Sequence, residues 1–196
     1  MKKLFSTLLF VFSVLTLVAQ DGSVTVSFKG AAPTITDFAW AYLFAGDDDG
    51  KKEYTGIKQA LTRYRKGLKQ GSGVTLTVDE KNGYILYEYS FASVTDRIEM
   101  CCWNVDDGKH KLFAFNDMSL SYKGQVIHTK NGGLRFCRYI NASKKMFMCD
   151  SPGFKLDKNS TYTLPRKGKD IIVTKPDRAG KNQKKTLKWN GWHFSF

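Results

Sequence analysis

The sequence is poor in proline, histidine and cysteine, with four, three and four of these residues among 196. So little proline excludes a collagen-like or proline-rich chain, and the three isolated histidines form no pair with the spacing of a zinc motif. After residue 20 the longest apolar run covers residues 38–45, which is too short to cross a membrane as a helix. An apolar content of 42% also excludes a disordered chain, so we expect an ordinary folded domain.

The first twenty residues have the layout of a secretory signal peptide. Two lysines at positions 2 and 3 precede an almost uncharged apolar stretch over residues 4–18, and the hydrophobicity ends at Ala19. This stretch is shorter than the roughly 20 apolar residues of a membrane anchor, so we expect cleavage after Ala19 or Gln20. An uncleaved interfacial anchor is the alternative. Residues 21–196 are therefore predicted to form a secreted or periplasmic bacterial protein without a membrane span.

The mature chain keeps a strong excess of positive charge, with 29 basic and 18 acidic residues. In a cytoplasmic protein this excess would point to nucleic acid. For an exported chain we expect no nucleic-acid partner. The expected partners are an anionic glycan, lipid phosphate, another component of the cell surface or an extracellular protein. A basic surface that serves only solubility is the alternative.

Residues 21–72 predict one strand and two helices. Alternation of apolar residues between Val24 and Phe28 indicates a strand with one exposed face. A short helix is expected over residues 36–45, because Asp37 suits a helix N-terminus. The second helix ends near Gly67. Its apolar face consists of Ile57, Ala60, Leu61, Tyr64 and Leu68.

Residues 73–196 predict an antiparallel β-meander. Val74, Leu76 and Val78 alternate with polar residues, and the following Asn82 and Gly83 give the strongest short-range signal for a hairpin. Turn signals then recur at intervals of which several are near eight to twelve residues, as in a barrel or a sandwich. We therefore predict a single α+β, mostly β domain, in which the N-terminal helical pair covers one face or open end of the sheet.

The last third of the chain contains the motifs Leu-Pro-Arg at residues 164–166 and Lys-Trp-Asn-Gly at residues 188–191, followed by Phe194. In this part the chain resembles the ends of exported bacterial β-rich proteins of unassigned function. The resemblance implies export and β structure, and it implies no chemistry.

The sequence offers little reactive chemistry. We assign no catalytic residue, no metal ligand and no cofactor, because no poised nucleophile, base or metal-binding set stands out. A glycan-acting hydrolase with carboxylates on separate strands is an alternative, since distant strands can bring two acids together. The available acids are Glu88, Glu99 and Asp117, and nothing in the sequence distinguishes them from ordinary surface acids.

Four cysteines in an exported chain permit a disulfide. If residues 141–145 form a hairpin turn centred on Ser143, Cys137 stands directly opposite Cys149 on one face of the sheet. Opposed cysteines can reach each other in the close register of an antiparallel pair. We therefore predict a bridge between Cys137 and Cys149, with free buried thiols as the alternative.

The basic C-terminal segment is the main candidate for binding. Residues 176–185 are expected to form a hairpin tip from which lysines can contact a polyanion, and Trp189 can offer a stacking surface. The candidate ligand-binding residues are Lys167, Lys169, Lys175, Lys181, Lys184, Lys185 and Trp189. In the alternative interpretation the lysines only solvate the tip, while Trp189, Trp192, Phe194 and Phe196 fill the core.

These features favour a non-enzymatic envelope or secreted binding protein that contacts an anionic glycan or lipid phosphate through its basic C-terminal loops. A protein-binding inhibitor of an extracellular enzyme or receptor is the second hypothesis. The hydrolase is the third.

Overall fold

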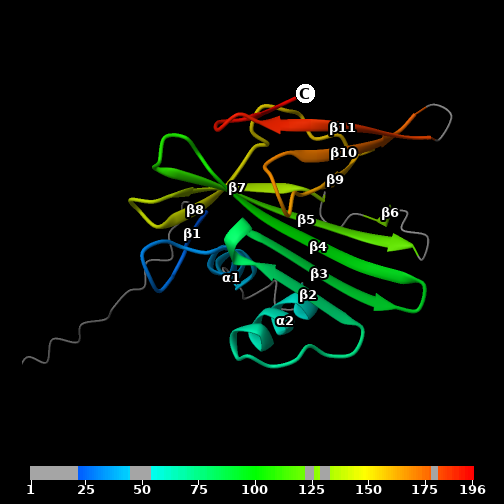
Figure 1. Cartoon of the computed structure of the whole chain (residues 1–196), viewed down its shortest axis with the longest axis horizontal. Helices are drawn as coiled ribbons and strands as arrows, with labels where there is room; N and C mark the ends of the chain where they lie inside the picture. Colours follow the sequence, from blue (N-terminus) through cyan, green and yellow to red (C-terminus); the bar gives the residue numbers. More distant parts are fainter. Residues whose placement is uncertain (1–21, 45–53, 122–125, 129–132, 178–180) are drawn as a thin grey trace, which may run out of the picture.

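The protein has three layers in a computed structural model that describes residues 22–44, 54–121, 126–128, 133–177 and 181–196. Two helices cover one face of a large sheet, and a small sheet covers part of the other face (Figure 1). No helix within the described ranges is long and apolar enough to cross a membrane. The prediction of an α+β, mostly β fold with a helical pair on one sheet face is confirmed, and the two sheets are open rather than closed into a barrel.

The large sheet has eight antiparallel strands in the order β1-β8-β7-β5-β4-β3-β2, with β6 paired to the end of β5. The bounds of its strands are β1 Ser23–Thr25, β2 Val74–Asp79, β3 Tyr84–Phe91, β4 Val94–Asn104, β5 His110–Ser121, β6 Val126–His128, β7 Arg135–Ile140 and β8 Lys145–Cys149. The predicted hairpin at Asn82 and Gly83 is present between β2 and β3, where Gly83 has a φ of 63°. This left-handed conformation suits glycine because it has no Cβ.

The small sheet is antiparallel and has the strand order β12-β11-β10-β9. The bounds of its strands are β9 Thr161–Thr163, β10 Ile171–Pro176, β11 Asn182–Trp189 and β12 Phe194–Ser195. The sequence left a barrel and a sandwich open for the predicted meander; in the structure the chain leaves the large sheet after β8 and builds this second sheet. β1 also departs from a simple meander. It is the first strand of the described chain, but it pairs with β8, which is the last strand of the large sheet in sequence order.

The strand β5 connects the two cores. All its residues from 112 to 119 are buried. Phe113 and Phe115 pack in the core under the helices, whereas Leu112 and Ala114 pack in the core under the small sheet. Because side chains of a strand alternate between faces, a strand covered on both sides reads as a continuous apolar run.

The helices lie close to their predicted positions. The helix α1 spans Ile35–Phe44, and α2 spans Thr55–Arg65. α2 ends as predicted at Gly67, whose φ is 67° and whose N–H donates to the carbonyl of Tyr64. The predicted apolar face of α2 is only partly buried. Ile57, Ala60 and Leu61 lie in the core, whereas Tyr64, near the end of α2, and Leu68, which follows the helix, are exposed.

Candidate functional site

The predicted lysines lie on the small sheet and its connections. Lys175 is on β10, Lys184 and Lys185 are on β11, and Lys167 and Lys169 are in the segment between β9 and β10. The expectation of a hairpin tip over residues 176–185 is wrong, because Pro176 and Asn182 already pair across the hairpin. The lysines of β11 are therefore held in a hydrogen-bonded strand.

Four exposed lysines, which we call the lysine row, follow this strand. Its members are Lys181, Lys184, Lys185 and Lys188. Lys184 and Lys188 share one face of β11, while Lys185 lies on the other face, opposite the buried Val173. At a rise of about 3.3 Å per residue, the row extends over roughly 23 Å.

The described cations of the small sheet differ in their ion pairs. The ammonium of Lys175 lies 2.6 Å from Oδ2 of Asp157, and Nε of Arg166 lies 3.2 Å from Oδ2 of Asp79. No described carboxylate lies within ion-pair distance of any member of the lysine row, nor of Lys167 or Lys169. Lys175 is therefore neutralised locally, and the other candidate lysines keep their charge toward the solvent.

Trp189 does not lie on the surface. It is 8% exposed, and its ring centroid is 4.8 Å from Phe194 and 6.3 Å from Trp103. The predicted stacking role of Trp189 is therefore wrong, because its ring forms part of the core between the sheets. Its neighbour Trp192 is 55% exposed and so does not fill the core as the alternative proposed.

The predicted disulfide is also wrong. Cys137 stands opposite Met148, and Cys149 stands opposite Phe136. The pairing is offset by one residue from a turn centred on Ser143. Because side chains alternate, Cys137 faces the helices and Cys149 faces the small sheet. All four cysteines are free thiols.

A cavity of about 530 Å³ lies between α2 and the helix-facing side of the large sheet. Its wall includes Gln59 of α2, Tyr87 and Tyr89 of β3, Asp96 of β4, and Asp117 and Ser119 of β5. The volume is within the range of ligand pockets, which hold small molecules among apolar walls with a few polar groups. This cavity was not predicted from the sequence.

Asp117 forms the inner end of the cavity. It is 2% exposed, and its Oδ2 accepts a hydrogen bond of 2.6 Å from the hydroxyl of Tyr54. Arg135 donates to the same Oδ2 at 3.2 Å and to the hydroxyl of Tyr54 at 2.6 Å. The guanidinium lies 5.0 Å from the ring centroid of Phe115. The buried carboxylate is thus neutralised by a fixed cation, as a buried charge requires.

Asp96 stands beside this end of the cavity. Its Oδ1 accepts a hydrogen bond of 2.7 Å from the hydroxyl of Ser119. The sequence contains a signal for this cluster. Asp117 and Ser119 continue the alternation of the buried Phe113 and Phe115, so two polar residues occupy positions that face the core.

Glu99 is the centre of a second polar cluster, on the opposite face of the large sheet. It is fully buried, and its Oε1 accepts hydrogen bonds from Arg97 at 2.8 Å and Tyr84 at 3.2 Å. Its Oε2 accepts from the backbone N–H of Leu164 at 3.0 Å and from Asn116 at 3.5 Å. Burial and the nearby Glu99 carboxylate raise the pKa of Tyr84, so its hydroxyl stays a donor.

These clusters correct the sequence interpretation of the acids. Glu99 and Asp117 are buried, and neither is an ordinary surface acid. Glu88 and Glu99 share Arg97, whose Nη1 lies 3.1 Å from Oε1 of Glu88. Asp117 lies on the other face of the sheet, so the three acids named for a hydrolase do not form one site.

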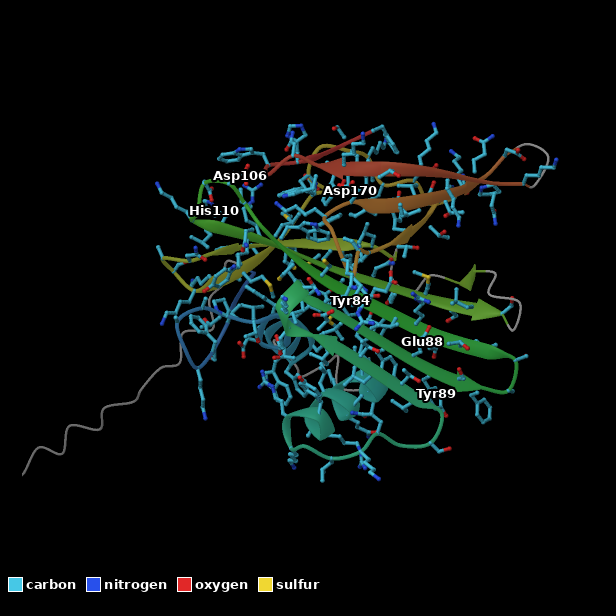
Figure 2. All side chains as sticks on the ribbon, in the orientation of Figure 1. Tyr84, Glu88, Tyr89, Asp106, His110 and Asp170 are labelled. Carbon is cyan, nitrogen blue, oxygen red and sulfur yellow. The ribbon has the colours of Figure 1, made fainter. Side chains whose placement is uncertain are left out.

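His110 and His193 make local contacts at turns. Nδ1 of His110 lies 2.5 Å from Oδ2 of Asp107, and this contact with His110 lowers the pKa of that carboxyl below its usual range. His193 contacts Asn190 across the last turn. Figure 2 shows His110 and Asp106 at one end of the large sheet, far from Glu88 and Tyr89 at the other. Within the described ranges, no three His, Cys, Asp or Glu side chains are grouped to hold a metal ion.

Comparison with known proteins found no match: no family model fits the sequence, and no curated protein or solved structure is detectably similar to the chain. The function is therefore argued from the side chains alone.

Proposed function

We propose that this chain is an exported, non-enzymatic binding protein that holds anionic groups of a glycan or a lipid head group along the lysine row of the small sheet. The observation that carries the proposal is the placement of three exposed lysines on β11 and of Lys181 directly before it, with no described carboxylate within ion-pair distance.

The geometry suits an extended ligand better than a single small anion. The lysine row is about 23 Å long at the usual strand rise, so one compact anion contacts only part of it. A chain of sulfate, phosphate or carboxylate groups can contact several ammonium groups together. Each lysine on its own contributes little in water, but a row of charges attracts a polyanion in a salt-dependent way.

The two aspartates of this segment support the proposal by their positions. Oδ1 of Asp170 accepts a hydrogen bond from the backbone N–H of Trp189, and Oδ1 of Asp177 accepts one from the backbone N–H of Lys181. Both carboxylates therefore accept backbone hydrogen bonds at the two ends of the β10–β11 hairpin. Between these ends, no acidic residue occurs among residues 182–188.

Retention on a heparin column tests the proposal. The wild-type protein is expected to bind at low salt and to elute as the salt concentration rises. The triple variant Lys181→Glu, Lys184→Glu, Lys185→Glu is expected to elute without retention. A matched control reverses three exposed lysines of other elements, Lys29→Glu, Lys66→Glu and Lys81→Glu, with the same change in net charge. The control is expected to retain most of the binding.

Two results would contradict the proposal: no retention of the wild-type protein at low salt, or equal losses in the two triple variants. The second result would show a response to net charge alone. Sedimentation with vesicles of anionic lipid, run beside vesicles of neutral lipid, separates a lipid phosphate from an acidic glycan as the source of the anion.

The export part of the proposal has its own test. The mass of the protein from the periplasm or medium of an expressing bacterium is expected to correspond to a chain that begins at Gln20 or Asp21. Recovery of the intact chain in the cytoplasm would contradict export.

The inhibitor hypothesis predicts a different partner. A pull-down from spent culture medium would then retain a protein, and this complex would survive moderate salt because an apolar contact is not screened. Phe91, Trp192 and Phe196, which are 71%, 55% and 73% exposed, are aromatic side chains available for such a contact.

A further inference from the structure

The cavity between α2 and the large sheet lies on the opposite side of the large sheet from the small sheet and its lysine row. It has walls of two kinds. α2 contributes Ile57 and Ala60, and the sheet contributes Val74 and Ile98, which give the cavity an apolar lining. Polar groups enter from Gln59 and from the carboxylates described above. An apolar lining with a few fixed polar groups is the usual composition of a small-molecule site.

The charges of the wall nearly cancel. Asp117 is neutralised by Arg135, and the guanidinium of Arg97 points to the other face, where it pairs with Glu99. Of the other charged side chains of the wall, Asp96 accepts a hydrogen bond from Ser119, and Arg63 donates one to the carbonyl of Lys69. A ligand with a strong net charge of either sign gains little here, so the cavity favours an uncharged ligand.

The polar groups of the wall suit hydroxyl groups. Carboxylates and amide oxygens accept hydrogen bonds, while tyrosine, serine and threonine hydroxyls both donate and accept. Burial, together with the nearby Asp96 carboxylate, raises the pKa of Tyr87, so that its hydroxyl remains protonated in neutral solution. A ligand with many hydroxyls can pair with both kinds of group, whereas a purely apolar ligand would leave them without partners.

Aromatic rings complete the wall. Tyr54, Tyr87 and Tyr89 all line the cavity, and Tyr89 is 36% exposed. Figure 2 shows Tyr89 toward the outer part of β3, away from the centre of the sheet where Tyr84 lies. A ring at this position offers an apolar face with a polar tip, which can cover the C–H face of a sugar ring.

From these observations we propose that the cavity binds a neutral polyhydroxylated molecule of the size of a mono- or disaccharide. Asp96 accepts hydrogen bonds from the ligand's hydroxyls, Tyr89 covers one ring face, and Gln59 borders the entrance on the α2 side. The site is separate from the lysine row, so it stands or fails independently of the proposed binding of polyanions.

The test measures binding to the purified mature protein by protein-detected NMR and calorimetry. The probes are methyl glucoside, methyl galactoside, N-acetylglucosamine, cellobiose and lactose, with glucuronate and glucosamine as the charged counterparts. We expect at least one neutral sugar to bind and to bind more tightly than either charged sugar. The substitution Asp96→Asn is expected to weaken that affinity at least tenfold, because the amide keeps the bond from Ser119 but loses the charged acceptor.

A second variant blocks the cavity without removing a polar contact of the core. Gln59 is exposed on α2 and lines the cavity, so Gln59→Trp fills its entrance and is expected to abolish binding. The matched control is Asp150→Asn, which removes an exposed carboxylate outside the cavity and is expected to leave the affinity unchanged.

Three results would overturn the assignment. They are no binding of any neutral sugar in the panel, tighter binding of the charged amine through Asp96, and binding that Gln59→Trp leaves intact. Loss of the lysine row does not affect this experiment, so the triple lysine variant is expected to bind the neutral sugar like the wild type.

Discussion

Glu99 and Asp117 lie on neighbouring strands of the large sheet, and both are almost completely buried, but they face opposite layers. Each oxygen of Glu99 accepts from described protein groups, including a backbone amide of the segment after β9. Asp117 is fixed by Tyr54 and Arg135 at the end of a cavity. Glu99, which is enclosed by protein groups, therefore connects the large sheet to the segment after β9. Asp117, which lies in the wall of a cavity, is also placed near a ligand that binds there.

The largest effect is expected from Glu99→Ala. This substitution leaves Arg97 without its buried partner and the amide of Leu164 without its acceptor, so the free energy of unfolding should fall by about 3 kcal/mol, as when one partner of a buried pair is removed. Urea unfolding measures the change. The double variant Arg97→Ala, Glu99→Ala should lose less than the sum of the single losses. Additive losses would show that the two side chains are not coupled.

A comparable effect is expected from high pH, and it involves buried thiols on both faces of the large sheet. Burial raises the pKa of the Cys101 thiol, on the small-sheet face, and of the Cys137 thiol, on the helix face, from 9.0 to about 12. The folded state therefore holds these protons more tightly than the unfolded state. The contribution of these thiols to the free energy of unfolding is fully present below pH 9. It should fall as the pH rises from 9 toward 12, by on the order of 1 kcal/mol per thiol per pH unit.

Urea unfolding between pH 8 and pH 10.5 checks this slope. Cys101→Ala and Cys137→Ala should each remove part of it, while Cys102 and Cys149, whose pKa values burial also raises, contribute the rest. A slope unchanged in both variants would contradict the assignment. Tyr42 and Tyr84, whose pKa values are also raised by burial, add to the loss only above about pH 10.

The next effect concerns the contact between α2 and β3 beside the cavity. A Cβ added at Gly56 would collide with the hydroxyl of Tyr87, so Gly56→Ala should cost about 1–3 kcal/mol. Tyr87→Phe removes the colliding oxygen. In that background Gly56→Ala should cost much less, and chemical unfolding of the four proteins measures the difference. An equal cost in both backgrounds would place the strain elsewhere.

The smallest effects on stability are expected at the proposed binding residues. Asp96→Asn and the triple lysine variant should each change the unfolding free energy by no more than about 0.5 kcal/mol, since neither removes a packed group. Thermal unfolding followed by circular dichroism checks this result. A large loss at either position would mean that the residue supports the fold, in the manner of Glu99.

Local signals in the sequence predicted the elements well. The spacing of Ile57, Ala60 and Leu61 located α2, and the Asn82–Gly83 pair located the first hairpin. Such signals depend on a few neighbouring residues. They do not report which strand pairs with which, so the sequence left a barrel and a sandwich of two sheets as alternatives. The offset of one residue at the β7–β8 turn was enough to move Cys149 to the other face.

The candidate site was harder to predict for the same reason. The sequence showed the lysine row as a run of basic residues. The structure places most of this run on the paired strand β11, where the sequence predicted a hairpin tip. The cavity needed knowledge of which polar residues face the helices. Asp96 and Asp117 are 21 positions apart in the sequence and become neighbours only through the register of β4 and β5, in which Asp96 lies opposite Ser119.

The pairing of β1 with β8 has a consequence for the order in which the strands of the large sheet pair during folding. Val24 lies beside Met146, so 121 positions of chain must be available before the first strand has its neighbour. Closing so distant a contact is entropically slow. The first strand of the described chain is therefore among the last to be paired, and until then β8 presents an open edge to which a strand of another chain can add.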